Sequence, residues 1–350
     1  MGTARSVVFK KVRRGSLFQL IFLGVVIGAA SAAVALLVPW LPPSAGKERD
    51  RIDFVFWFTT TICLAIFAVV AAVIVYSVIK FRARPDDDSD GPPIHGHSGL
   101  EIGWTALPAA LVTAIGIVSA VVLARNRDVP KDHLTVNVTA QQFAWTFKYP
   151  GQGNLASSVL RLPLHKPVEL EIKALDVIHS FWVPEFGQKQ DAVPGLTTHL
   201  KITPTKLGTF PVICTELCGL GHALMRSEAI VMQPAKFAAW VKQAKKGISG
   251  GGTAAGKTVF DENGCSSCHT FAPAAAKGTV GPSLDDLAGA AQKAGKPLEE
   301  FVKESIVDPN AYIAPGYAPN VMPQTFAQLP KAQLDALVQF LTGAGKKGKA

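Results

Sequence analysis

The hydrophobic residues of this chain are concentrated in three long runs near its N-terminus. The runs cover residues 17–41, 54–79 and 102–123. At a rise of about 1.5 Å per residue, each is long enough as a helix to cross a hydrocarbon core of about 30 Å. Residues 53–125 are therefore predicted to hold two transmembrane helices, at 54–79 and 102–123. Residues 1–45 form either a signal peptide or a first transmembrane segment, and "ASA" at Ala30–Ala32 resembles a cleavage site, which favours the signal peptide.

Basic residues gather beside these runs. They are Lys10, Lys11, Arg13 and Arg14 before the first run, and Lys80, Arg82 and Arg84 after the second. Because positively charged flanks stay in the cytoplasm, we expect the large C-terminal part of the chain on the outer face of the membrane. The net charge of +9 does not indicate a nucleic-acid partner, since the sequence has no helix-long basic stripe and no nucleic-acid motif.

Beyond residue 131 the pattern changes to short β-branched or aromatic runs separated by Pro, Gly and Asp. These runs lie at residues 134–140, 143–149, 158–163, 168–174, 199–204, 209–214 and 228–233. Their spacing predicts an all-β sandwich or small barrel within residues 131–246, closed by a helix that begins near Pro234. Residues 247–256 are rich in Gly and predict a flexible linker. Residues 257–345 contain helical patterns at both ends.

The loop between the last two predicted strands carries an unusual set of metal ligands. Cys214, Cys218, His222 and Met225 lie close together, with Glu216 between the two thiols. Structural zinc sites use paired spacings such as CxxC and rarely use Met, whereas thiolates with imidazole and a thioether suit copper. Copper is the favoured interpretation, and zinc or a disulfide between the two cysteines remains an alternative at this point.

A second motif, CSSCH at residues 265–269, has the CxxCH spacing of covalent c-type haem attachment. Cys265 and Cys268 would anchor the haem, and His269 would supply one axial ligand. No Cys or His follows the motif in the sequence, so a zinc site here would lack further ligands. Met322 is the one methionine after the motif and is the predicted sixth ligand of the haem iron.

Three stretches together resemble subunit II of the haem-copper cytochrome c oxidases, in the subclass with a fused cytochrome c. They are DVIHSFWVP at 176–184, CTELCGLGHALM at 214–225 and CSSCH at 265–269. The resemblance implies a multidomain membrane protein: N-terminal transmembrane helices, an all-β cupredoxin-like Greek-key domain at 131–246 and an all-α class I cytochrome c domain at 257–345. It also implies a binuclear copper centre, CuA, with the ligands His179, Cys214, the carbonyl of Glu216, Cys218, His222 and Met225, His179 being delivered from a loop.

The same resemblance gives roles to two glutamates and one aromatic position. The carboxylate of Glu216 would point away from copper, towards a magnesium site shared with subunit I. Glu101, in LEIGWTALP, would guard the mouth of a proton-conducting channel, although an ordinary acid at a helix N-terminus also fits its position. Phe143 stands where other members of the family present an exposed Trp to soluble cytochrome c.

None of the three apolar runs contains a His, so an oxygen-reducing metal site must lie on a partner. We expect an electron-input subunit of a terminal respiratory cytochrome c oxidase in a bacterial plasma membrane, bound to subunit I and other oxidase subunits. Electrons from cytochrome c or a cytochrome bc complex would pass through haem c and CuA to subunit I, where oxygen is reduced to water and protons are translocated.

Two other functional classes remain open from the sequence. One is a membrane-anchored electron carrier, with CuA and one haem c, that serves another reductase. The other is a subunit similar to those of nitrous oxide or nitric oxide reductases, which share the copper or the cytochrome but not this order of domains. A quinol oxidase subunit is disfavoured, because the copper ligands that those subunits have lost are all present.

Overall fold

The structure is a computed structural model that describes residues 14–82, 96–249, 253–322, 324–329 and 331–345. The chain divides into two compact units. One comprises Met1–Pro42 and Ile52–Leu123, and the other comprises Pro43–Arg51 and Ala124–Ala350. Four of the basic residues that support the predicted orientation, Lys10, Lys11, Arg13 and Arg84, lie outside the described residues.

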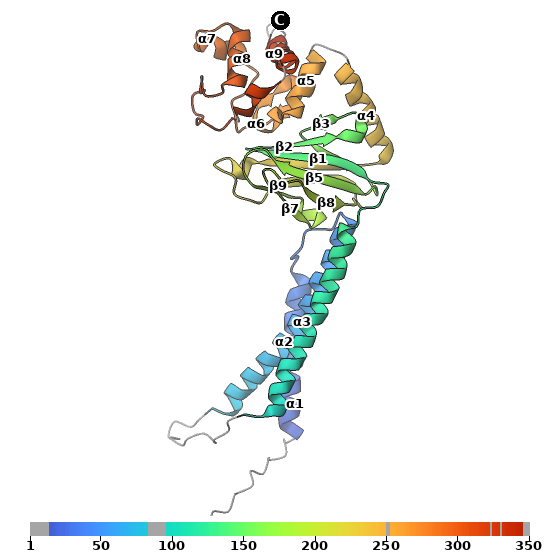
Figure 1. The fold of residues 1–350 in the computed structure, drawn as a ribbon. Helices are drawn as coiled ribbons and strands as arrows, with labels where there is room; N and C mark the ends of the chain where they lie inside the picture. Colours follow the sequence, from blue (N-terminus) through green and yellow to red (C-terminus); the bar gives the residue numbers. More distant parts are fainter. Residues whose placement is uncertain (1–13, 83–95, 250–252, 323, 330, 346–350) are drawn as a thin grey trace, which may run out of the picture. The chain divides into compact units, whose positions relative to one another are not determined.

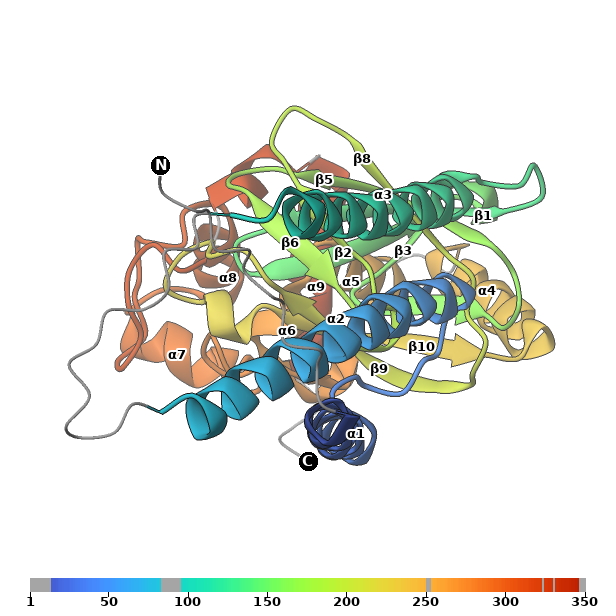
Figure 2. The ribbon, with the colours of Figure 1, turned by 90° about the horizontal axis from the view of Figure 1, so that it is seen from below.

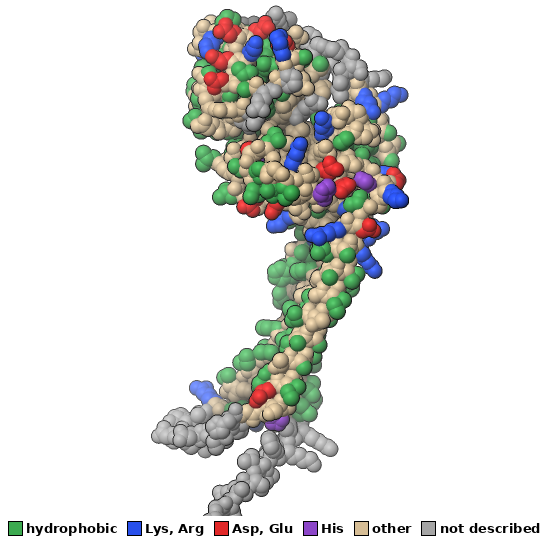
Figure 3. Space-filling view, in the orientation of Figure 1, with side chains coloured by type: hydrophobic (Ala, Val, Ile, Leu, Met, Phe, Trp, Pro, Cys, Tyr) green, Lys and Arg blue, Asp and Glu red, His purple; other side chains and the backbone are tan. Residues whose placement is uncertain are grey.

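The first unit is built from three long apolar helices, α1 (Arg14–Leu37), α2 (Lys47–Lys80) and α3 (Ser98–Arg127). All three are long and apolar enough to cross a membrane, and few charged side chains lie along their length (Figure 3). Helices α2 and α3 extend beyond the predicted apolar runs because polar residues at their ends continue the helix. Whether α1 is cleaved as a signal peptide stays a prediction.

Small residues let α1 and α2 approach each other closely. A Cβ atom added at Gly24 would lie 3.7 Å from Ala72, and one added at Gly28 would lie 3.4 Å from Ala68. Contacts of this kind drive helix association in lipid, where the hydrophobic effect contributes little. Figure 2 shows α1 nearly end-on and α2 obliquely, so the two helices cross at an angle.

The second unit begins with a β-sandwich of two five-stranded sheets (Figure 1). The strands are β1 (Leu134–Gln141), β2 (Ala144–Tyr149), β3 (Leu155–Ser157), β4 (Leu160–Pro163), β5 (Val168–Ala174), β6 (His179–Trp182), β7 (Lys189–Ala192), β8 (Thr198–Ile202), β9 (Gly208–Cys214) and β10 (Arg226–Met232). The sheet orders are β3-β2-β1-β5-β8 and β4-β10-β9-β6-β7. The β1–β5 and β4–β10 pairs are parallel and the other pairs are antiparallel, as in a Greek-key cupredoxin-like domain.

Alternation of buried and exposed positions along the strands explains the sandwich. In β1 and β5 every second residue is buried, and these side chains meet those of the other sheet in one hydrophobic core around Trp145, Phe147 and Phe181. Strands β3, β6 and β7 lie outside the runs predicted from the sequence. His179 is the first residue of β6, so it lies on a strand and not in a loop as predicted.

The remainder of the second unit is helical. Its main helices are α4 (Pro234–Ser249), α5 (Thr253–Glu262), α6 (Cys265–Cys268), α7 (Leu287–Lys293), α8 (Leu298–Val307) and α9 (Lys331–Gly345). Phe260, Phe271 and Phe340 form an aromatic cluster with ring centroids 5.4–6.0 Å apart. Helix α4 ends at Ser249 and α5 begins at Thr253, so the connection is shorter than the predicted linker of residues 247–256.

A buried ion pair fixes the segment Pro43–Arg51 to the β-sandwich. Glu48 accepts hydrogen bonds from the backbone N–H and the hydroxyl of Thr203, at 2.7 and 3.0 Å, and its carboxylate lies 3.7 Å from Lys201 Nζ. Lys201 also donates to the carbonyls of Arg125 and Asp128. Removing one partner of such a pair leaves a buried charge uncompensated, at a cost of about 3–5 kcal/mol.

Candidate metal centres

The loop between β9 and β10 brings the predicted copper ligands together. Cys214 Sγ lies 3.9 Å from Cys218 Sγ and 3.9 Å from His179 Nδ1, and Cys218 Sγ lies 3.5 Å from His222 Nδ1 and 3.8 Å from Met225 Sδ. The carbonyl oxygen of Glu216 lies 3.3 Å from Cys214 Sγ. All six predicted ligands therefore converge on one place.

The two cysteines are free and their sulfurs are too far apart for a disulfide, whose S–S bond is about 2.0 Å. Two sulfurs, two ring nitrogens, a thioether and a carbonyl form a soft donor set that suits copper. These residues fit a CuA centre, which would supply one-electron redox chemistry at this loop. Strands β6, β9 and β10 belong to one sheet, so the ligands are held with little freedom to move.

Asp176 orients His179. Its Oδ1 lies 2.8 Å from His179 Nε2, which leaves Nδ1 facing the cysteine sulfurs. Burial would lower the pKa of His179, but hydrogen bonds with Asp176 and Cys214 outweigh burial and raise this pKa to about 9. Without a metal the imidazole therefore holds a proton that a metal ion would displace.

The pKa values of the two thiols are shifted in opposite directions. Burial would raise the pKa of Cys214, but hydrogen bonds from His179 and from backbone groups lower it to about 6. Burial and the adjacent charge of Cys214 raise the pKa of Cys218 to about 12. The two shifts run in opposite directions because the charge on one sulfur opposes ionisation of the other, and a bound cation would favour ionisation of both.

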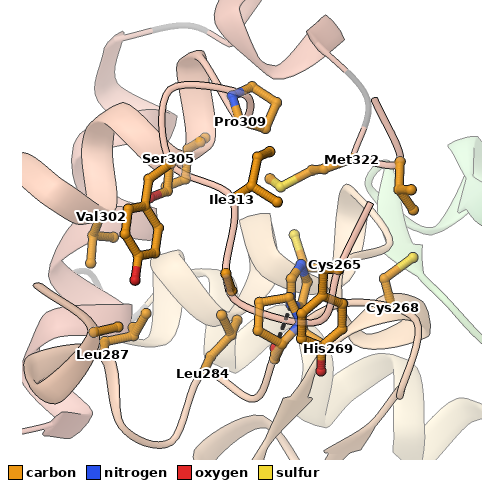
Figure 4. Close-up of a pocket in the computed structure, with 18 of the residues that line it drawn as sticks. Cys265, Cys268, His269, Leu284, Leu287, Val302, Ser305, Pro309, Ile313 and Met322 are labelled. Atoms are coloured by element: carbon orange, nitrogen blue, oxygen red, sulfur yellow. Dashed lines mark hydrogen bonds between the residues drawn. The ribbon is translucent and has the colours of Figure 1, made fainter. Parts of the chain in front are cut away.

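The helical part of the second unit contains a large, mostly apolar cavity. Its volume is about 190 Å³, and its lining includes Cys265, Cys268, His269 and Met322. Figure 4 shows Met322 on the opposite side of the cavity from His269, and apolar side chains such as Leu284, Val302 and Ile313 line the cavity beside them. This arrangement fits a haem c that is anchored by the cysteines and would supply one-electron chemistry between two axial ligands.

The backbone fixes the orientation of His269. Its Nδ1 lies 2.8 Å from the carbonyl of Pro282, which can only accept, so Nδ1 carries the proton and Nε2 is free to bind iron. Burial lowers the pKa of His269 and so favours the neutral ring. Gly281 makes room for the ring, because a Cβ atom at this position would lie 2.5 Å from His269 Cε1.

We expect Met322→Ala to leave the haem attached through its two thioether bonds and to lower its midpoint potential. The shift should be on the order of 0.1–0.2 V, because Met ligation raises the potential of a haem and axial ligands span about 0.8 V. A spectroelectrochemical titration measures it. Met232→Ala, on β10, is the matched control and should change neither potential nor spectrum. An unchanged potential in Met322→Ala would show that another residue binds the iron.

The resemblance also gave roles to Glu216, Glu101 and Phe143, which lie outside the two groups of converging ligands or contribute only a carbonyl. The side chain of Glu216 is exposed and only its carbonyl faces the cysteine sulfurs. Glu101 lies in the first turn of α3, where its Oε1 accepts a hydrogen bond of 2.9 Å from the backbone N–H of His97. Phe143 is buried, with 4% of its surface exposed, so it does not form the exposed aromatic surface that the resemblance associates with this position.

Two residues near the copper ligands were missed from the sequence. Asp176 orients His179, and its place in the same motif, three residues earlier, could have identified it. Gln142 donates from its side-chain amide to the carbonyl of Cys218 at 2.5 Å, and its backbone N–H donates to Asp176 Oδ2 at 2.6 Å. Nothing in the local sequence indicates these contacts of Gln142, because they join residues 34 and 76 positions apart.

Comparison with known families covers most of the chain. The transmembrane domain of cytochrome c oxidase subunit II matches residues 34–122, the periplasmic domain of the same subunit matches residues 156–234, and cytochrome c matches residues 253–344. Cytochrome c oxidase subunit 2 of Bacillus subtilis is 31% identical over 329 residues, covering 87% of this chain and 91% of the relative. The chain belongs to the cytochrome c oxidase subunit II family.

Another relative agrees with this assignment, and part of the chain is similar in sequence to a solved structure. Cytochrome c oxidase subunit 2 of Alkalihalophilus pseudofirmus is 31% identical over 297 residues, covering 80% of this chain and 83% of the relative. The crystal structure of the periplasmic domain of subunit II from Bradyrhizobium japonicum is 33% identical, covers 34% of this chain and 98% of that chain, and gives a TM-score of 0.33. Membership confirms the expected domain types and implies CuA copper, haem c, a subunit I partner and a membrane location for this oxidase subunit.

Proposed function

We propose that this chain is the electron-input subunit of a terminal respiratory cytochrome c oxidase in a bacterial plasma membrane. Electrons from cytochrome c or a cytochrome bc complex enter at the haem c site, pass to the copper site and leave to subunit I, where oxygen is reduced to water with proton translocation. The observation that carries the proposal is the presence of both donor sets, for copper and for haem, in one compact unit.

The magnesium site is part of the same proposal. Glu216 is exposed while its carbonyl lies beside Cys214 Sγ, so its carboxylate would be available to bind Mg²⁺ together with subunit I. Hard cations such as Mg²⁺ prefer carboxylate oxygens, whereas the sulfur ligands beside it suit copper. One short loop can therefore contribute to two metals of different kinds.

Purification of the complex tests the function. We expect a membrane complex whose optical spectrum contains haem c, whose near-infrared and EPR spectra contain the CuA signal, and which includes a haem-copper subunit that reduces oxygen. Metal analysis should account for the copper and iron. A purified complex with CuA and haem c but without any haem-copper subunit would contradict the proposal and favour the electron carrier that serves another reductase.

We expect Glu101→Ala to slow turnover of the assembled oxidase by up to about tenfold, less than the 10²–10⁴-fold of a direct acid–base catalyst. A carboxylate at a channel mouth affects proton supply and leaves both metal spectra unchanged. Steady-state oxygen consumption measures the effect. Glu300→Ala, which removes another exposed acid from the first turn of a helix, is the matched control. Full activity of Glu101→Ala would show that Glu101 does not affect proton supply and only accepts the hydrogen bond from His97.

A further inference from the structure

A second cluster of metal-binding residue types lies on the β-sandwich and includes none of the copper or haem ligands. Its members are His133, Glu169, Glu171 and His199, which are called the His–Glu cluster below. The two glutamates lie on β5, His199 lies on β8, and His133 immediately precedes β1. Figure 3 shows histidine and acidic side chains next to one another on the β-sandwich.

Strand pairing brings the members of the His–Glu cluster together. Glu171 lies directly opposite His199 in the antiparallel β5–β8 pair, and Glu169 is two positions earlier on the same face of β5. One carboxylate oxygen of Glu169 lies 3.2 Å from His133 Nε2, and the other lies 3.0 Å from His199 Nδ1. The ligand atoms of Glu169, Glu171 and His199 all lie within 4.8 Å of one another. Four side chains from three neighbouring parts of the sheet therefore converge.

The backbone fixes which nitrogen of His133 faces the cluster as an acceptor. Its Nδ1 lies 2.8 Å from the carbonyl oxygen of Pro130, which can only accept, so Nδ1 carries a proton. In the neutral ring Nε2 then presents a lone pair to a carboxylate oxygen of Glu169, which also only accepts. Two such acceptors repel each other unless a proton or a metal ion lies between them. Metal-binding histidines use the same kind of hydrogen bond to a carbonyl to orient the ligating nitrogen.

Basic side chains do not neutralise the two glutamates. Among the described residues, no Lys or Arg forms an ion pair with Glu169 or Glu171. Lys201 lies opposite Glu169 on β8, but its ammonium group donates to two backbone carbonyls and pairs with Glu48. Asn137, in register with Glu171 on β1, has a buried side-chain oxygen with no hydrogen-bond partner in the described part of the chain. This face of the sheet thus has an excess of acceptors, which a cation would satisfy.

Two imidazoles with two carboxylates select a divalent transition metal. Mg²⁺ and Ca²⁺ prefer oxygen ligands and soft copper prefers sulfur, whereas Zn²⁺ binds imidazole nitrogen and carboxylate oxygen together. Tetrahedral Zn²⁺ with bonds of about 2.0–2.1 Å places neighbouring ligand atoms about 3.3 Å apart. The distances of 3.0 and 3.2 Å between Glu169 and the two imidazoles are close to this value. A zinc ion would therefore need only small movements of these side chains.

We propose that the His–Glu cluster binds one divalent cation of the zinc type, at a site separate from the copper and haem centres. His133 binds through Nε2, His199 binds through Nδ1, and each glutamate binds through a carboxylate oxygen. The ion joins β5 to β8 and to the segment that leads into β1, and these three strands are neighbours in the sheet. The proposal involves no redox step and does not depend on the proposed function.

Zinc binding to the full chain, with copper and haem c in place, tests the site. Equilibrium dialysis against Zn²⁺ measures the number of bound ions and their affinity. His133→Asn and Glu171→Gln should each weaken the binding of one zinc ion by more than about 100-fold, because loss of an outer hydrogen-bond partner alone costs about 10–100-fold. Unchanged CuA and haem c spectra show that each variant is folded.

His165→Asn and Glu228→Gln are the matched controls, because both residues are exposed on the same β-sandwich and lie outside the His–Glu cluster. These two variants should bind zinc as the unaltered chain does. A chain that binds no zinc beyond that retained by His133→Asn and Glu171→Gln would overturn the proposal.

X-ray absorption at the zinc edge gives a second test, which needs no variant. The spectrum of the unaltered chain with one bound Zn²⁺ should show two imidazole nitrogens together with oxygen ligands at about 2.0–2.1 Å. Copper and iron do not interfere, because they absorb at other energies. A spectrum without imidazole nitrogen, or one with sulfur ligands, would overturn the proposal, since the His–Glu cluster contains two histidines and no cysteine.

Discussion

Cys218→Ser should abolish the binuclear copper signal and stop electron delivery to oxygen, while the haem stays covalently attached. Cys218 Sγ contacts Cys214, His222 and Met225, so its loss affects three other members of the donor set. A Ser hydroxyl stays protonated where a bridging thiolate is needed. EPR, copper analysis and oxygen consumption measure the loss, and turnover should fall to that of oxidase depleted of copper.

Cys63→Ser controls for the loss of a thiol, since Cys63 is free and lies on α2 outside both centres. It should keep both spectra and full turnover. The haem c spectrum serves as an internal control, because the haem is attached at Cys265 and Cys268 in a separate hydrophobic cluster. Retention of the CuA signal and normal turnover in Cys218→Ser would contradict the copper assignment.

Deletion of residues 250–350 should slow oxidation of the natural donor by at least about tenfold, because a donor held at an effective concentration on the order of millimolar is lost. The β-sandwich offers little to attract a separate basic cytochrome: residues 131–236 contain ten Lys and Arg against eight Asp and Glu. Phe143, which stands where the resemblance places an exposed Trp, is buried in the full chain. Rapid mixing of the truncated oxidase with soluble cytochrome c measures the rate.

A small-molecule reductant provides the control for this deletion. The truncated oxidase should still accept electrons from it and consume oxygen, which would show that the copper centre and subunit I remain intact. The deletion begins after α4 and leaves the β-sandwich core whole. A rate of reduction by soluble cytochrome c equal to that of the intact oxidase would show that the fused domain is not the main route for electrons.

Many elements and ligand residues of this protein could be predicted from short stretches of its sequence. Apolar runs longer than a bilayer identify helices whatever their tertiary setting, so α1, α2 and α3 were expected from composition alone. The CxxCH motif keeps Cys265, Cys268 and His269 together on one short segment, and the copper loop does the same for Cys214, Cys218, His222 and Met225. In these two segments the separation of the ligand residues along the chain already fixes how close they lie in the folded protein.

Local patterns failed where short polar strands were involved. β7 has the sequence KQDA, without alternation, and β6 begins at His179, a predicted copper ligand, so neither showed the signal of a strand. The Gly-rich stretch before the cytochrome domain indicated a long flexible linker, yet α4 continues to Ser249 and α5 begins at Thr253.

The sequence by itself determined which atoms can bind copper and haem, because a donor set is a property of residue types and of short spacings. Only the tertiary structure decided how those atoms are oriented and connected. His179 meets Cys214 through the pairing of β6 with β9, Asp176 turns the ring of His179, and Gln142 reaches Cys218 across 76 residues. Such contacts depend on the register of strands in a closed sandwich, which is set by burial of the whole core and not by any one segment.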